Sequence, residues 1–166
     1  MEPSKFTVIR DSREQLAHGW SFDEDSHCAG TLIEKLDTGD YSLQGLEDFL
    51  AIERKETIQE FARNCVEKRW GDCMKRLSEI PHSYIIFEFN EEDIERYPHS
   101  AKVPPAVRKR MCWANGKPRI AVKYIRKVLH TAEDYGIKII FCGDKLKAEQ
   151  EAYKIMREAY EIYVQR

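Results

Sequence analysis

Short apolar runs of strand length recur along the chain and alternate with longer stretches of helical spacing. The runs FTVIR (6–10), TLIEKL (31–36) and DFLAIERK (48–55) combine β-branched or aromatic residues with bounding turn residues, which predicts three strands. The runs SYIIFEF (83–89) and IKIIFCG (137–143) predict two further strands. The first of these is expected in the centre of a sheet, because strands covered on both faces are apolar throughout.

Helical periodicity fills the intervals between these strands. Apolar residues recur at steps of three and four over 56–78, and the prolines at 104 and 105 suit the start of a second helix. A third helix is predicted over about 116–135 and a fourth over roughly 145–164. Strands interleaved with helices in this order predict an α/β fold, in which helices cover both faces of one sheet as an α/β/α sandwich.

Composition is that of one folded domain spanning residues 1–166. Apolar residues make up 42% and aromatic residues 11%, and there is no repeat or low-complexity tract. The five cysteines form no CxxC pair and leave one over in any pairing, which is typical of reduced thiols in a cytosol. No apolar run reaches membrane-spanning length, so we expect a cytoplasmic, nucleoid-associated protein without a membrane partner.

Charge is unevenly distributed, although the formal net charge is only −2. Residues 102–132 contain nine Lys and Arg and no Asp or Glu, whereas the rest of the chain has 18 basic and 29 acidic residues. Such a basic stretch predicts binding to a phosphate backbone, with a solvated helix face as the ordinary alternative. The residues expected to contact DNA are Arg108, Lys109, Arg119, Lys123, Arg126 and Lys127. The last four share one helical face, opposite the apolar residues Ala121, Ile125, Val128, Leu129 and Ala132.

The stretch GDYSLQGLEDFLAIERK (39–55) holds a candidate catalytic set. Side chains alternate along a strand, so Glu53 and Lys55 project to one side and Arg54 to the other. With Asp40 at the preceding turn they form an Asp…Glu-x-Lys pattern. Two carboxylates can hold Mg²⁺, and the lysine can orient or deprotonate water or balance charge in the transition state. The structural alternative is a surface ion pair between Glu53 and Lys55, with Asp40 as a turn former.

Four separated segments together show a family resemblance. VIRDSREQ (8–15), GDY (39–41), AIERK (51–55) and RLSEIPHSYIIFE (76–88) occur in this order. With them the chain resembles the XPF/Hef/Mus-type nuclease domains, whose signature is GD followed by ERKxxxD. The resemblance implies a restriction-endonuclease-like, PD-(D/E)xK fold with a mixed central sheet. It also implies Mg²⁺- or Mn²⁺-dependent, structure-specific endonuclease cleavage of branched, flapped or forked DNA.

The resemblance also implies roles for individual residues. The metal-holding acids are Asp11, Asp40 and Glu53, and Lys55 lies beside the nucleophilic water. Arg13 and Arg54 position the acids or grip phosphate, and Glu14 contacts the residues that hold the metal. Asp11 has a local alternative, as the N-cap of a helix over SREQLAHG (12–19).

The sequence departs from the family pattern in two respects. Gln59 stands where the family has an aspartate, and Glu60, about 100° further around a helix, is not expected to replace it. No helix-hairpin-helix or helicase module is recognisable. We therefore expect a freestanding nuclease domain, of the kind a phage or mobile element encodes, that grips DNA by itself or through a partner.

A rival function remains open at this point, namely a pseudonuclease that binds DNA or a partner nuclease without cutting. Gln59 favours the rival, while the intact Asp40, Glu53 and Lys55 favour the enzyme. We also expect a homodimer, or a heterodimer with a related nuclease subunit, and a role in DNA repair or recombination. Tyr97 and Trp113 are either core residues or residues that stack on unpaired bases. The stripe of the last helix either faces the core or forms a dimer interface; it consists of Tyr153, Met156, Tyr160 and Tyr163.

Overall fold

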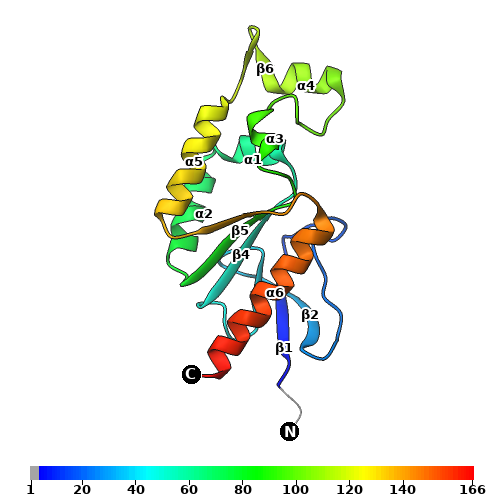
Figure 1. Ribbon diagram of the computed structural model, residues 1–166, viewed down its shortest axis with the longest axis vertical. Helices are drawn as coiled ribbons and strands as arrows, with labels where there is room; N and C mark the ends of the chain where they lie inside the picture. The colour runs from blue at the N-terminus through cyan, green and yellow to red at the C-terminus, as the bar shows by residue number, and fades with distance from the viewer. Residues whose placement is uncertain (1–3) are drawn as a thin grey trace.

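A six-stranded mixed sheet forms the centre of the computed structural model, which describes residues 4–166 (Figure 1). Its strands, in spatial order, are β2 (Cys28–Glu34), β1 (Phe6–Asp11), β3 (Tyr41–Leu43), β4 (Leu50–Lys55), β5 (His82–Phe87) and β8 (Lys138–Phe141). β1 and β2 are parallel, as are β4, β5 and β8, while β3 is antiparallel to both β1 and β4. The predicted α/β fold with a mixed central sheet is confirmed.

Helices cover both faces of this sheet (Figure 1). In chain order, the helices of the described residues are α1 (Ile58–Asn64), α2 (Lys68–Ser78), α3 (Glu92–Glu95), α4 (Pro105–Cys112), α5 (Val122–Asp134) and α6 (Lys145–Val164). α6 packs on the face of β4 that carries Leu50 and Ile52, whereas α1, α2 and α5 share a core with Ala51 on the other face. No helix in the described part of the chain combines the length and apolar character needed to cross a membrane.

The predicted helix over 56–78 is two helices in the structure. A turn at residues 65–67 separates α1 from α2, and Glu67 has extended backbone angles before α2 begins. This turn allows Trp70 of α2 to pack edge-on against Phe61 of α1, with ring centroids 5.6 Å apart. Two short helices therefore bury their aromatic residues against each other as well as against the sheet.

A short hairpin replaces the first part of the helix predicted over 116–135. Its strands, β6 (Trp113–Ala114) and β7 (Lys117–Pro118), join through Asn115 and Gly116, whose φ angles are 50° and 74°. Asn-Gly is a strong signal for a tight hairpin turn, so the sequence contained this information. The strand β3 was also missed, since three residues are too few to show an alternating pattern.

The apolar stripe of the last helix faces the core for most of its length. Met156 is fully buried, and Tyr153 and Tyr160 pack against Phe6 with ring centroids 5.7 and 5.8 Å away. The prediction is wrong at Tyr163, which is exposed because the buried residues of α6 end at Ala159. The core interpretation of the stripe is confirmed for its first three residues.

Candidate active site

Three chain segments meet at the edge of the sheet where β1 and β4 end. Asp11 is the last residue of β1, Glu53 and Lys55 lie at the end of β4, and Asp40 lies in the turn before β3. Backbone hydrogen bonds from Asp11 N to Asp40 O and from Asp40 N to Ile52 O, both 2.8 Å long, hold the segments side by side. The four functional side chains line one pocket of about 390 Å³. The structure thus brings together residues that are up to 44 positions apart in the sequence.

Gly39 makes this close approach sterically possible. Its φ is +77°, and a Cβ atom here would lie 3.0 Å from Ile52 O and 3.2 Å from Ile52 N. A side chain would therefore strain the turn and push it away from β4. The glycine of the GD pair positions Asp40 through its missing side chain.

Asp40 carries a strongly perturbed carboxyl group. Burial, followed by the nearby carboxylates of Glu53 and Glu14, raises the pKa of Asp40 well above its usual value. Its Oδ2 accepts a 2.8 Å hydrogen bond from the backbone N–H of Arg54, which only partly offsets these effects. Carboxylates crowded in this way favour a bound cation, because a cation stabilises their ionised forms together.

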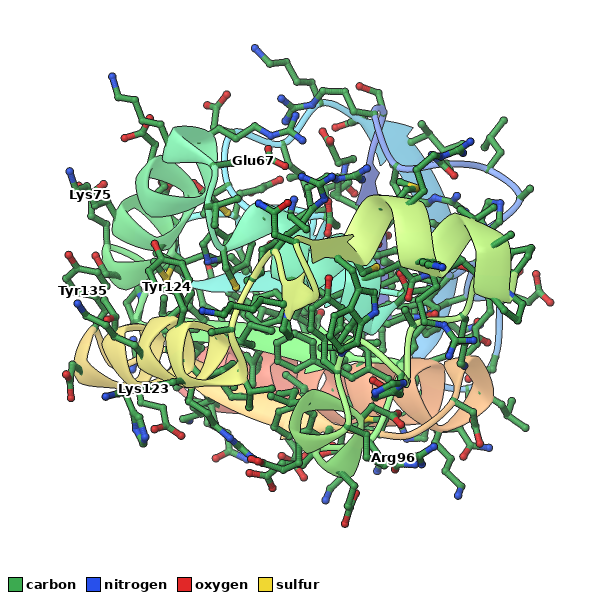
Figure 2. The ribbon with its side chains drawn as sticks, turned by 90° about the horizontal axis from the view of Figure 1, so that it is seen from above. Glu67, Lys75, Arg96, Lys123, Tyr124 and Tyr135 are labelled. Carbon is green, nitrogen blue, oxygen red and sulfur yellow. The ribbon has the colours of Figure 1, made fainter. Side chains whose placement is uncertain are left out.

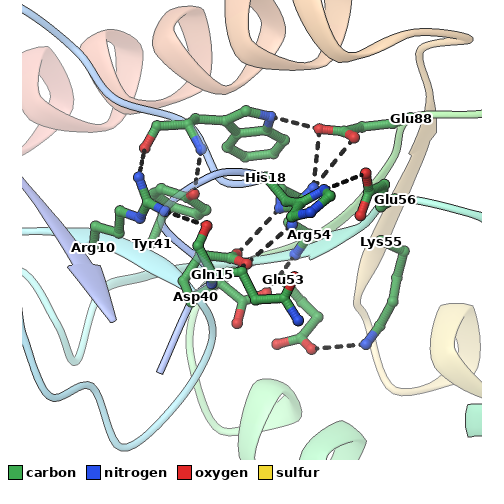
Figure 3. Close-up of polar contacts among 12 residues, drawn as sticks. Arg10, Gln15, His18, Asp40, Tyr41, Glu53, Arg54, Lys55, Glu56 and Glu88 are labelled. Carbon is green, nitrogen blue, oxygen red and sulfur yellow. Dashed lines mark hydrogen bonds and ion pairs between the residues drawn. The ribbon is translucent and has the colours of Figure 1, made fainter. Parts of the chain in front are cut away.

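Lys55 is buried next to these acids and keeps its charge. Its Nζ lies 3.2 Å from Glu53 Oε1 (Figure 3). The same atom lies 4.7 Å from the centroid of the Trp70 ring. Burial lowers the pKa of Lys55, but the carboxylates of Glu53, Asp40 and Glu60 outweigh burial and raise its pKa overall. The lysine is therefore an ammonium group at neutral pH, which suits stabilisation of negative charge better than removal of a proton.

Asp11 lines the pocket, but both of its carboxylate oxygens already have donors. Oδ1 accepts a 2.8 Å hydrogen bond from Leu36 N, and Oδ2 accepts a 2.9 Å hydrogen bond from Arg13 Nε. The hydrogen bond with Asp11 is the main reason that the pKa of Arg13 is raised. The Arg13 side chain is 67% exposed at the rim of the pocket. No helix follows Asp11, so the N-cap alternative is wrong.

The carboxylates of the pocket were expected to surround one metal ion as a set of three. Among residues 4–166, no three His, Cys, Asp or Glu side chains are grouped closely enough to hold a metal ion. The expected cluster of Asp11, Asp40 and Glu53 is not formed, because Arg13 and Leu36 N bind the oxygens of Asp11. Asp40 and Glu53 remain, and a pair of carboxylates fits Mg²⁺, which keeps several waters and binds through one or two carboxylates.

Arg54 leaves β4 on the side opposite Glu53 and Lys55 (Figure 3). Its guanidinium donates hydrogen bonds of 3.0 to 3.2 Å to both oxygens of Glu14 and of Glu88. Burial opposes its charge, but the hydrogen bonds and attraction of Glu14 and the attraction of Glu88 raise its pKa. With a side chain only 6% exposed, Arg54 does not grip phosphate, so that assignment is wrong. It positions the site instead, since its backbone N–H holds Asp40.

A second buried arginine, Arg10, was not predicted as part of the site. Its Nη1 donates to Trp20 O and Ser21 Oγ at 3.1 Å, and its Nη2 donates to Gln15 O at 2.5 Å (Figure 3). Arg10 and Arg54 together hold the loop that follows β1, from which Arg13 reaches the pocket. The signal was an arginine inside the apolar strand run FTVIR, where a charged side chain needs buried partners.

The structure places Glu60, and not Gln59, at the pocket. Gln59 does not line the pocket; its side chain pairs with the backbone of Lys102, through hydrogen bonds of 3.2 and 3.5 Å. Glu60 lines the pocket and is one of the carboxylates that raise the pKa of Lys55. The sequence did not lead us to expect Glu60 at this position; the structure brings it to the pocket lining, two residues after the start of α1 at Ile58.

The basic stretch 102–132 does not form one continuous ridge. Arg126 lies 2.8 Å from Glu91 and 2.6 Å from Glu95, so its side chain already has acidic partners within the protein, and a DNA contact there stays a prediction. Lys123, labelled in Figure 2, and Lys127 are exposed on α5. Neither forms an ion pair within residues 4–166. The apolar side of α5 is buried as predicted, apart from Ala121, which is exposed because it precedes the helix.

Residues 104–121, here called the arm, stand above α1 and α3 in Figure 1. The arm contains α4 and the β6–β7 hairpin and carries Arg108, Lys109 and Arg119. Arg119 therefore precedes α5 and does not share a helical face with Lys123. At the base of the arm Tyr97 is buried in the core, as the packing interpretation required, and Trp113 is half-buried with its ring 5.4 Å from His99.

The chain was compared with known proteins. Neither a protein-family model nor a curated protein matches it. Its structure is similar to that of XPF from Aeropyrum pernix, with a TM-score of 0.55, 20% sequence identity, and coverage of 96% of this chain and 66% of that one. The same protein in complex with DNA also matches, with a TM-score of 0.55, 19% identity, and coverage of 98% of this chain and 67% of that one.

This chain therefore spans about two thirds of the length of the solved XPF chains. The similarity extends over nearly all of its own length. The predicted restriction-endonuclease-like fold of the XPF type is confirmed.

Proposed function

We propose that this protein is a metal-dependent, structure-specific DNA endonuclease that hydrolyses phosphodiester bonds in branched or flapped DNA. The observation that carries the proposal is the convergence of Asp40, Glu53 and Lys55 in one polar pocket, with the pKa of Asp40 raised by burial and by the surrounding acids. The solved complex of Aeropyrum pernix XPF with DNA supports DNA as the substrate class.

Each residue of the pocket has a distinct task in this proposal. Asp40 and Glu53 hold a divalent cation, and Mg²⁺ or Mn²⁺, when bound, polarises the scissile phosphate and lowers the pKa of a bound water. The ammonium group of Lys55 stabilises negative charge that develops on the phosphate. Arg13, exposed at the rim, contacts the neighbouring phosphate, while Asp11 fixes its orientation.

Glu60 weakens the case for the rival pseudonuclease. That rival depended on the loss of an acid at Gln59, yet Glu60 supplies a carboxylate to the same pocket. The number of acids around Lys55 is therefore maintained by a residue one position further along. The expected homodimer or heterodimer, and the role in DNA repair or recombination, stay predictions.

The test is cleavage of labelled flap, fork, four-way junction and linear duplex DNA in Mg²⁺, in Mn²⁺ and in EDTA. We expect metal-dependent cleavage of the branched substrates, and a loss of at least about a hundredfold in Asp40→Asn and Glu53→Gln. Binding of Mn²⁺, followed by calorimetry without DNA, should weaken in the same two variants. Asp134→Asn, a matched change of an exposed carboxylate on α5, should alter neither result.

Binding of branched DNA without cleavage under every metal condition would reject the enzyme and support the pseudonuclease. Cleavage that survives in Asp40→Asn and Glu53→Gln would place the chemistry at another site.

A further inference from the structure

A second, larger groove adjoins the catalytic pocket. It has a volume of about 820 Å³ and shares Arg13, Glu14 and Glu60 with the pocket of about 390 Å³. One wall is α1 with the loop after β1, and the other wall is the arm. The two spaces are therefore adjacent, with these three side chains between them, and the second space is here called the arm groove.

The arm groove combines apolar surface with exposed arginines. Val103, Met111 and Ile120 supply apolar lining, and Met111, which directly follows three basic residues of α4, is more than half exposed. Arg63 from α1 and Arg119 from the arm are both exposed at the groove. Sites for single-stranded nucleic acid place cations for the phosphates beside surface on which bases lie; the side chains here are aliphatic, so bases would make apolar contacts rather than ring stacking.

The carboxylates of the arm groove are mostly engaged with internal partners. Glu14 is bound on both oxygens by Arg54, and Glu56 lies 2.9 Å from His18 Nδ1. Arg63 has only a long contact of 3.9 Å with Glu67, and an exposed pair of this kind contributes little. Four arginines and three glutamates line the groove; Arg13 and Arg54 are engaged with acids, whereas Arg63 and Arg119 are exposed and without a close acidic partner within residues 4–166. These two cations favour an anionic occupant on the arm side of the groove.

The arm wall adds to this preference for an anion, because residues 102–132 contain no Asp or Glu at all. A duplex needs only phosphate contacts on an open surface, whereas unpaired bases also gain from apolar side chains on which they can lie. We propose that the arm groove binds a single-stranded segment of the DNA substrate, continuous with the strand that enters the catalytic pocket. This inference uses the proposed function only to identify the strand that continues into the catalytic pocket.

The test is equilibrium binding of a fluorescent oligothymidylate and of a blunt duplex, measured by anisotropy in EDTA, so that no cleavage is involved. The variant Arg63→Glu/Arg119→Glu should bind the oligonucleotide about tenfold or more weakly than the wild type, with a shallower salt dependence. Its affinity for the duplex should change less. Lys154→Glu/Arg157→Glu, which makes the same charge change on the exposed side of α6, is the matched control and should retain oligonucleotide binding.

A second measurement locates the strand. A benzophenone amino acid replacing Met111 should crosslink to a single-stranded branch, whereas the same probe replacing Ile162 on α6, which is also exposed, should not. Crosslinking of the Met111 probe to a second copy of the protein would overturn the proposal and mark the groove as a protein interface.

These results separate the two proposals. Unchanged oligonucleotide binding in Arg63→Glu/Arg119→Glu would overturn the arm-groove inference even if the protein cuts DNA. A selective loss of oligonucleotide binding in a protein that never cuts would support the groove and reject the enzyme.

Discussion

The two sides of β4 at its carboxyl end carry buried charges in contrasting states. On one side Glu53 and Lys55 share a pocket with further acids, and the pKa of Asp40 is raised by burial and then by the nearby carboxylates of Glu53 and Glu14. On the other side Arg54 is matched by Glu14 and Glu88, with hydrogen bonds to both carboxylates. Removing one member of a balanced buried set is costly, whereas an excess of carboxylates in a pocket is what a bound cation can balance.

The largest loss of unfolding free energy should come from Arg54→Ala, which removes the positive charge from the balanced side of β4. The change leaves Glu14 and Glu88 buried without their partner, and breaking such a buried pair costs about 3–5 kcal/mol of unfolding free energy. Urea unfolding measures the effect. Arg157→Ala removes an exposed pair with Glu161 and should cost less than about 1 kcal/mol, so equal losses in the two variants would contradict the distinction.

Gly39→Ala should come next. A non-glycine residue at φ +77° is strained, and its Cβ would approach Ile52 O to 3.0 Å, so we expect a loss of about 2 kcal/mol or more. Cleavage should fall with it, because the turn carries Asp40 away from Glu53. Gly71→Ala is the control: it lies in α2 with open space around its Cβ position and should stabilise the protein slightly. A neutral Gly39→Ala would show that the turn tolerates a side chain.

Glu60→Gln tests whether the carboxylate of Glu60, which the sequence did not lead us to expect in the pocket, contributes to cleavage. We expect cleavage to fall by about tenfold and the affinity for Mn²⁺ to decrease, because one carboxylate near Lys55 is lost. Gln59→Asp should have little effect, since Gln59 binds the backbone of Lys102 outside the pocket. Recovery or gain of activity in Gln59→Asp together with an inert Glu60→Gln would reverse the assignment.

The smallest effect is a dependence of stability on pH that arises from Asp40. Its pKa is higher in the folded than in the unfolded protein, so the folded state binds the proton more tightly and loses stability as pH rises above about 4 toward the raised value. Asp40→Asn should therefore be more stable than the wild type at neutral pH, and the difference should vanish below about pH 4.

Thermal unfolding across this pH range measures that difference, and Mn²⁺ at neutral pH should stabilise the wild type more than Asp40→Asn. A wild type that is stabilised relative to Asp40→Asn as pH rises would contradict the excess of negative charge in the pocket.

Local pattern predicted much of the fold. The alternation in LAIERK correctly separated Glu53 and Lys55 from Arg54, and the last helix was predicted over the same residues that form α6. The β6–β7 hairpin could also have been predicted, since Asn115-Gly116 is a hairpin signal. The prediction of a helix over 116–135 did not take this signal into account. Such features depend on neighbours within a few residues, which is why the sequence alone reports them.

The sequence by itself determined the alternation of strands and helices, the GD turn and the placement of an acid and a lysine on one side of β4. Only the tertiary structure decided that Glu60 lines the pocket while Gln59 does not, that Arg126 binds Glu91 and Glu95, and that Arg54 lies between Glu14 and Glu88. The physical reason is that the role of a charged side chain depends on the groups that surround it in the folded protein. Those groups come from segments 30 to 40 residues away, which no local pattern specifies.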